Sequence, residues 1–181
     1  MNYKFKTKPY AHQLKALERS WDKEYFAYFM EMGTGKSKVL IDNASILYDK
    51  GEINGLLLIA PKGVYKNWYD GEIPTHMVDH IEKKVVLWET SNSSIEKIKE
   101  LNTMFATGTD FHILVMNVEA FSYPKATEFA RRFLSCHKAM MAIDESTTIK
   151  TPTANRTRNI VSLKPLAKYR RILTGSPITN S

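Results

Sequence analysis

Unbroken apolar runs of strand length are the feature that most constrains the fold of this chain. The runs are YFAYFM (25–30), GLLLIAP (55–61), KKVVLW (83–88), FHILVMN (111–117), KAMMAID (138–144) and YRRILTGS (169–176). Strands that lack alternating polar residues are buried on both faces, which is typical of parallel sheets. The sequence therefore predicts an α/β fold, a three-layer sandwich with a mostly parallel sheet.

The stretches between these runs have the apolar spacing of helices. They are AHQLKALERSW (11–21), KSKVLIDNASILYDKG (36–51), SSIEKIKELNTMFATG (93–108) and YPKATEFARRFLS (123–135). A length of 181 residues suits one domain spanning 1–181. In such sheets ligands bind beyond the carboxyl ends of the strands, so the residues just past those ends are the candidates for function.

Composition narrows the possible partners and compartment. The net charge of +7 favours an anionic partner, nucleic acid or nucleotide, with a basic but inert surface as the alternative. The single cysteine, Cys136, excludes an internal disulfide, and the five histidines show no metal-ligand spacing. No apolar signal core and no run of about 20 apolar residues occur, which predicts a cytoplasmic protein without a membrane partner.

The stretch FMEMGTGKSKVL (29–40) joins a predicted strand to a predicted helix through a glycine-rich loop. Such a loop can curl so that its backbone N–H groups cradle a phosphate, and the helix adds its positive dipole end. A lysine can then reach the β- and γ-phosphates, and a serine hydroxyl can ligate Mg²⁺. The predicted nucleotide-binding residues are Met32, Gly33, Thr34, Gly35, Lys36 and Ser37.

The match to the full phosphate-loop pattern is incomplete, because its first glycine falls at Met30. The shorter pattern G-x-G-K-[ST] is intact from Gly33 to Ser37. The alternative interpretation is a glycine turn at a helix start, with Lys36 on the surface.

Two acids, Asp144 and Glu145, directly follow the apolar run MMAI. Beside a phosphate loop, Asp144 can hold Mg²⁺ through water, and Glu145 can orient and deprotonate the attacking water. Neighbouring residues of an extended segment point in opposite directions, so one acid can face the metal and the other the γ-phosphate. The alternative is a helix cap or a solvated turn.

The strings MGTGKS, IDES and LTGSP, in that order, resemble motifs I, II and III of superfamily-two helicases and translocases. The sequence is most similar to the Swi/Snf-type branch, because EMG stands before Lys36 and APKGVYKNWYDGE supplies Pro61, Asn67, Trp68 and Glu72. The resemblance extends from about Pro9 to Ser181. It implies a RecA-like P-loop NTPase lobe that uses ATP and Mg²⁺, with nucleic acid as partner, DNA more than RNA.

The same resemblance implies roles for residues outside the loop and the acidic pair. In PYAHQ, Gln13 resembles the residue that recognises adenine, and Tyr10 could stack on the base. Thr174 and Ser176 resemble the motif that couples the nucleotide site to the nucleic acid, and Lys62 resembles a phosphate contact. The alternatives are a polar helix residue at Gln13 and a strand-end turn at Ser176, while Trp68 is expected in the core.

Two departures from the family pattern stand out. The second motif reads DEST where DEAH or DEAD is more usual, and no motif of a second RecA-like lobe occurs in the sequence. The chain is expected to be a first lobe, either excised or natural, that a second lobe completes in cis or in trans. Since an arginine finger from such a lobe can be worth ~10³-fold or more in rate, the lobe alone should be weak or inactive.

Two other functions are compatible with parts of the sequence. A stand-alone nucleic-acid- or protein-binding module could keep this fold without ATP turnover. A small nucleotide kinase would need an arginine-rich lid, and LTGSP has no role in such an enzyme.

Overall fold

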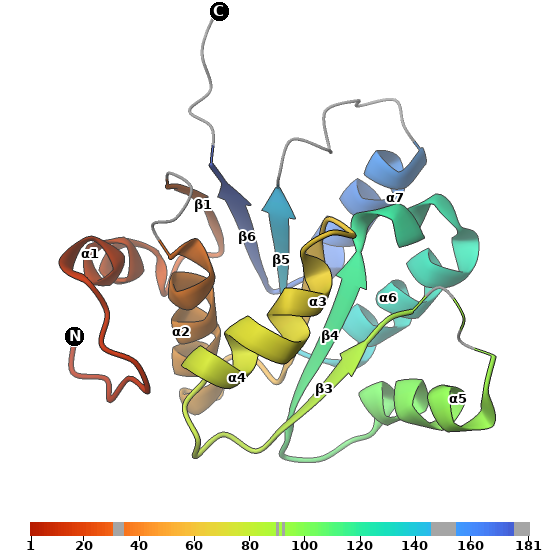
Figure 1. Ribbon diagram of the computed structural model, residues 1–181, viewed down its shortest axis with the longest axis horizontal. Helices are drawn as coiled ribbons and strands as arrows, with labels where there is room; N and C mark the ends of the chain where they lie inside the picture. The colour runs from red at the N-terminus through yellow and green to blue at the C-terminus, as the bar shows by residue number, and fades with distance from the viewer. Residues whose placement is uncertain (31–34, 90, 92, 146–154, 176–181) are drawn as a thin grey trace, which may run out of the picture.

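The computed structural model describes residues 1–30, 35–89, 91, 93–145 and 155–175, with Glu145 described in its backbone only. All the strand pairs in these residues are parallel, and the strand order is β1-β6-β5-β2-β4-β3 (Figure 1). The strands are β1 (Tyr25–Phe29), β2 (Gly55–Ala60), β3 (Lys83–Leu87), β4 (Phe111–Asn117), β5 (Ala139–Glu145) and β6 (Tyr169–Thr174). The predicted α/β fold with a parallel sheet is confirmed.

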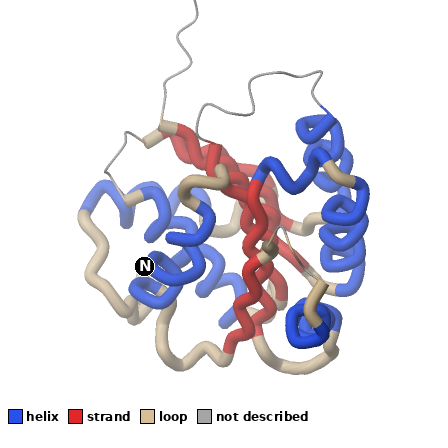
Figure 2. The backbone as a smooth tube through the Cα atoms, turned by 45° about the vertical axis from the view of Figure 1, so that its right-hand side comes forward, coloured by secondary structure: helices blue, strands red, loops and turns tan. Residues whose placement is uncertain are grey.

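Helices cover both faces of the sheet and form the outer layers of the sandwich (Figure 2). On one face lie α1 (Ala11–Ser20), α2 (Lys36–Asp49), α3 (Tyr65–Asn67), the π-helical segment η1 (Trp68–Glu72) and α4 (Ile73–His76). On the other lie α5 (Ile95–Asn102), α6 (Pro124–Cys136) and α7 (Asn155–Leu163), with the short 3₁₀ segments η2 (Thr103–Phe105), η3 (Val118–Ser122) and η4 (Lys164–Leu166). None of the helices in the described residues is long and apolar enough to cross a membrane.

Strand β5 shows how the two cores are separated. Met140 and Ala142 pack in the core that holds α2, whereas Met141 and Ile143 pack in the core of α5, α6 and α7. Alternation along a strand therefore places the next residue, Asp144, on the face that carries α2.

The sequence pattern does not predict two of the helical segments. Residues from Tyr65 to His76 pass through α3, η1 and α4 in short pieces, and the π-helical turn shifts the apolar spacing away from the 3.6-residue period. Helix α7 has few apolar residues and buries only Ile160 and Leu163, so its periodicity is weak.

A buried arginine ties α1 and α2 to the sheet. The Arg171 side chain is 1% exposed and donates hydrogen bonds of 2.9 Å to the Asn43 Oδ1, to the Ser20 carbonyl and to the Arg170 carbonyl. Burial lowers the pKa of this guanidinium, and the nearby Tyr28 opposes that effect. Because Asn43 belongs to α2 and Ser20 to α1, this network holds both helices against β6.

A buried ion pair within α2 makes the stability of the protein depend on pH. Lys38 Nζ lies 2.7 Å from Asp42 Oδ2, and Asp42 is 2% exposed. Burial raises the pKa of Asp42 from its ordinary 3.8 to about 6, against the lowering effect of Lys38. A raised folded-state pKa means that the folded protein binds more protons in this window. The free energy of unfolding should therefore fall by up to about 3 kcal/mol as the pH rises from about 4 to about 6.

Urea unfolding across this pH window measures the effect. In Asp42→Asn the contribution of this carboxyl disappears, so the difference in stability between variant and wild type should change across the window. A constant difference would show that Asp42 does not titrate there. The difference should move in favour of the variant as the pH rises, because its amide cannot ionise in the buried site.

Candidate nucleotide-binding site

The last residue of the predicted phosphate loop, Gly35, adopts a conformation that few other residues tolerate. Its φ is +80°, and it forms the N-cap of α2. A Cβ at this position would lie 2.1 Å from Gln13 Nε2, which donates a hydrogen bond of 3.3 Å to the Gly35 carbonyl. The chain therefore makes a narrow backbone passage between α1 and α2 at Gly35, where any other residue would need an unfavourable φ and a shift of the Gln13 side chain.

Gln13 is held in place from both ends of its amide. Its Oε1 accepts a 2.8 Å hydrogen bond from the Tyr10 N–H, and the side chain is 4% exposed. The bond to Tyr10 is the one that a glutamine at N3 makes to the N-cap of its own helix, so this amide closes the start of α1 and also lies beside Gly35. The ring of Tyr10, by contrast, is 71% exposed and could take a stacked base.

Lys36 and Ser37 occupy the first turn of α2. No hydrogen bond from the side chain at the N-cap closes this end of the helix, since that residue is glycine, and the first turn contains no acid. Within the described cap and first turn, no side chain therefore satisfies the N–H groups or the positive dipole end of this 14-residue helix.

Asp144 stands near the end of β5, on the same face as α2. Its Oδ2 accepts a 3.0 Å hydrogen bond from the indole Nε1 of Trp68. Trp68 is 2% exposed, so the expectation that this residue belongs to the core is confirmed. The hydrogen bond to Asp144 was not predicted from the sequence.

The strand register brings three candidate segments into one row. Thr174 is the Cα partner of Phe29 on one side and of Glu145 on the other, and its carbonyl accepts a 3.2 Å hydrogen bond from the Met30 N–H. The end of β1, the end of β6 and the acidic pair thus meet at one edge of the sheet. Thr174 and Asp144 themselves point to opposite faces, because Asp144 is in register with Leu173.

Several predicted residues lie outside the described part of the chain. These are Met32, Gly33 and Thr34 in the loop, the side chain of Glu145, and Ser176. Their roles stay predictions. The same holds for any metal ligand set, although Ser37 and Asp144 supply the oxygen donors that Mg²⁺ prefers. In the described residues no group of three or more His, Cys, Asp or Glu side chains could hold a metal ion by itself.

Lys62 lies apart from the residues above, after the end of β2, and is exposed. Its backbone N–H donates a 3.2 Å hydrogen bond to Glu119 Oε2. The two residues border a hollow of about 510 Å³, which Asn117, Tyr123 and Lys125 also line. The amide that would meet a phosphate is therefore already in contact with a carboxylate.

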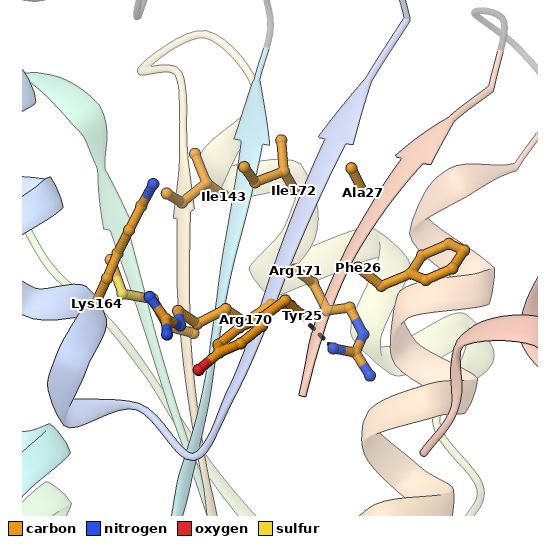
Figure 3. A pocket seen from close by; sticks show the side chains of 9 residues that line it. Tyr25, Phe26, Ala27, Ile143, Lys164, Arg170, Arg171 and Ile172 are labelled. Carbon is orange, nitrogen blue, oxygen red and sulfur yellow. Dashed lines mark hydrogen bonds between the residues drawn. The ribbon is translucent and has the colours of Figure 1, made fainter. Parts of the chain in front are cut away.

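A separate hollow of about 310 Å³ lies on the α7 face of β1, β6 and β5 (Figure 3). In Figure 3 the side chains of Ala27, Ile172 and Ile143 lie in a row across the three strands, and Lys164 stands beside them. The guanidinium carbon of Arg170 lies 4.0 Å from the centroid of the Tyr25 ring. None of the residues predicted for the site lines this hollow.

Comparison with known proteins agrees with this architecture. The chain is 29% identical over 155 residues to the chromatin-remodeling ATPase INO80 of Schizosaccharomyces pombe, a match that covers 83% of this chain and 9% of that protein. The fold is similar to a Sulfolobus solfataricus SWI2/SNF2 ATPase core solved with dsDNA (TM-score 0.74, 22% identity, 100% of this chain, 35% of that chain). It is also similar to the bacteriophage T4 UvsW helicase (TM-score 0.63, 14% identity, 94% of this chain, 53% of that chain).

The chain thus spans 9% of the INO80 protein, 35% of the Sulfolobus solfataricus chain and 53% of the UvsW chain, and its fold matches the RecA-like lobe of the SWI2/SNF2 ATPase core. Residues 28–181 match the SNF2-related domain family, which is most of the sequence. The resemblance to the Swi/Snf branch of superfamily two is therefore confirmed, and the chain belongs to the SNF2-related domain family.

Proposed function

We propose that this chain is the ATP-binding lobe of a nucleic-acid-dependent ATPase, a helicase or DNA translocase. The observation that carries the proposal is the passage at Gly35. There a glycine with a left-handed φ begins α2, whose N-cap has no side-chain hydrogen bond, and the buried Gln13 amide contacts this glycine. This arrangement suits a nucleotide whose base lies near α1 and whose phosphates lie against α2.

The residues around this passage have complementary roles. Gln13 binds the adenine edge, and the amides of the loop with Lys36 bind the phosphates. Ser37 and Asp144 would hold Mg²⁺, which when bound neutralises charge on the β- and γ-phosphates. Glu145 accepts a proton from the attacking water as general base. Thr174 and Ser176 couple the nucleotide site to the nucleic-acid surface. Thr174 is in register with Glu145.

A nucleic acid and a second RecA-like lobe are the partners of this proposal. The net charge of +7 favours a polyanion, and the solved relative from Sulfolobus solfataricus is described as a complex with dsDNA. Lys62 and the hollow beside it would contact the phosphate backbone without reading sequence. The second lobe, in cis or in trans, would supply the remaining catalytic groups.

Nucleotide binding by wild type and Lys36→Ala tests the proposal, together with ATP hydrolysis in the presence and absence of duplex DNA. Mg²⁺-dependent nucleotide binding that Lys36→Ala removes, and hydrolysis that duplex DNA stimulates once the second lobe is supplied, are the expected results. Binding of DNA without nucleotide binding, unaffected by Lys36→Ala, would show instead a binding module on the same fold.

Removal of the negative charge at Glu119 should strengthen binding of duplex DNA. Its carboxylate competes with phosphate for the Lys62 amide, and Glu119→Gln keeps an oxygen acceptor while removing the charge. One charge a few ångströms from a phosphate is worth about 1 kcal/mol in water, so the Kd should fall by about 5-fold at low salt. Fluorescence anisotropy with a labelled duplex measures this change.

Glu128→Gln is the matched control, because Glu128 is an exposed acid on α6 that pairs only loosely with Arg131 at 3.6 Å. It changes the net charge of the protein by the same amount. Equal effects of the two substitutions would show that Glu119 acts through total charge and not through the Lys62 amide.

A further inference from the structure

We propose that Trp68 is a positioning residue that fixes the orientation of the Asp144 carboxylate for Mg²⁺. The inference rests on the proposed function and assigns it an additional residue. Its basis is one contact between segments 76 residues apart, the 3.0 Å hydrogen bond from the indole Nε1 to Asp144 Oδ2. The donor belongs to the helical layer and the acceptor to the end of a strand, so the bond crosses between the two layers.

The position of the indole is fixed by the segment that carries it. Trp68 begins the π-helical turn η1, and its carbonyl accepts the hydrogen bond from the Ile73 N–H that defines this turn. The ring is 2% exposed within the core that also holds Val39 and Leu40 of α2. The donor therefore has little freedom to follow a carboxylate that rotates.

The chemistry of the donor suits a metal-binding acid. An indole N–H only donates, carries no charge and does not titrate, so it neither binds the metal nor neutralises the carboxylate. A lysine or arginine in the same place would compete with the cation for the negative charge. With Oδ2 engaged by the indole, the rotation of the carboxylate is restricted, and no hydrogen bond from the described residues occupies Oδ1, which can face the metal or its water. Partners of this kind orient metal ligands in many proteins.

The substitution Trp68→Phe removes the donor and keeps an aromatic ring in the core. The measurement is binding of a fluorescent, nonhydrolysable ATP analogue as a function of Mg²⁺ concentration. We expect the Mg²⁺ concentration at half effect to rise by about 10-fold or more, the usual result of losing an outer-shell partner, with Mg²⁺-free binding of the analogue unchanged. A merely structural role would weaken both kinds of binding together.

Trp88→Phe is the matched control, because Trp88 is also buried (5% exposed) but packs in the core on the opposite face of the sheet. It should leave the Mg²⁺ dependence as in the wild type. If Trp68→Phe also leaves the Mg²⁺ dependence as in the wild type, while Asp144→Asn abolishes it, the inference is wrong and the proposed function stands. If the wild type shows no Mg²⁺-dependent nucleotide binding at all, both are wrong.

A second measurement does not depend on the stability of Trp68→Phe. The chain has three tryptophans, so ¹⁵N-labelled indole groups give three resolvable NMR signals. The Trp68 signal should shift in Asp144→Ala, which deletes the acceptor, and in the wild type when Mg²⁺ and the analogue are added together. The Trp88 signal should stay in place in both experiments. A Trp68 signal whose position stays the same in both experiments would overturn the inference.

Discussion

The substitution Glu145→Gln is expected to lower the rate of ATP hydrolysis by about 10²–10⁴-fold, the usual contribution of a general base, while nucleotide binding persists. The amide keeps the size and hydrogen-bonding capacity of the side chain but cannot accept a proton from water. The backbone of Glu145 ends β5 in register with Thr174 of β6, and Thr174 is in turn in register with Phe29 at the end of β1. Phosphate release in the presence of duplex DNA and the second lobe measures the rate.

Lys36→Ala provides the contrast to this substitution. Lys36 is proposed to bind phosphate, so its loss should remove nucleotide binding and hydrolysis together. Nucleotide binding must therefore be kept in Glu145→Gln and lost in Lys36→Ala. Hydrolysis that survives Glu145→Gln at the wild-type rate would remove Glu145 from the mechanism.

The second large effect is expected from Gly35→Ala. A left-handed conformation costs a non-glycine residue about 1–2 kcal/mol. The new Cβ would also lie 2.1 Å from Gln13 Nε2, so Gln13 must move. We therefore expect a loss of stability greater than the backbone cost alone, and a loss of nucleotide affinity of about 10-fold or more, which corresponds to about 1.4 kcal/mol.

Gly51→Ala separates these two causes. Gly51 also has a left-handed φ, +73°, but a Cβ there would meet no atom within 4 Å, and the residue lies at the far end of α2. In urea unfolding, Gly51→Ala should lose only the free energy that the left-handed backbone costs a non-glycine residue. It should bind nucleotide as the wild type does. If both variants bind nucleotide equally well, the passage at Gly35 does not form part of the binding site.

The strands could be predicted from the sequence because the residues of each strand show by themselves that it is buried. The runs GLLLIA and FHILVMN are buried at every position, and their two polar residues, His112 and Asn117, do not produce the alternation that would indicate a solvated face. The start of α2 was equally clear, since two glycines precede a long apolar helix. These features need no knowledge of which strand lies beside which.

The contacts that refine the site could not be predicted in this way. Trp68 and Asp144 are 76 residues apart, and Lys62 and Glu119 are 57 apart. Both pairs form only because the fold places their segments together, and nothing in the local pattern of either segment indicates the partner. The π-helical turn at Trp68 similarly departs from the period on which helix prediction depends. The sequence therefore indicated the chemistry of the candidate site, and the fold added the residues that orient it.

A crystal structure of the chain with Mg²⁺ and a nonhydrolysable ATP analogue tests the central claim most directly. The account predicts the triphosphate against the backbone amides of Gly35 and Lys36, the base beside Gln13, and the metal near Ser37 and Asp144. A nucleotide bound elsewhere, or a metal remote from Asp144, would contradict it.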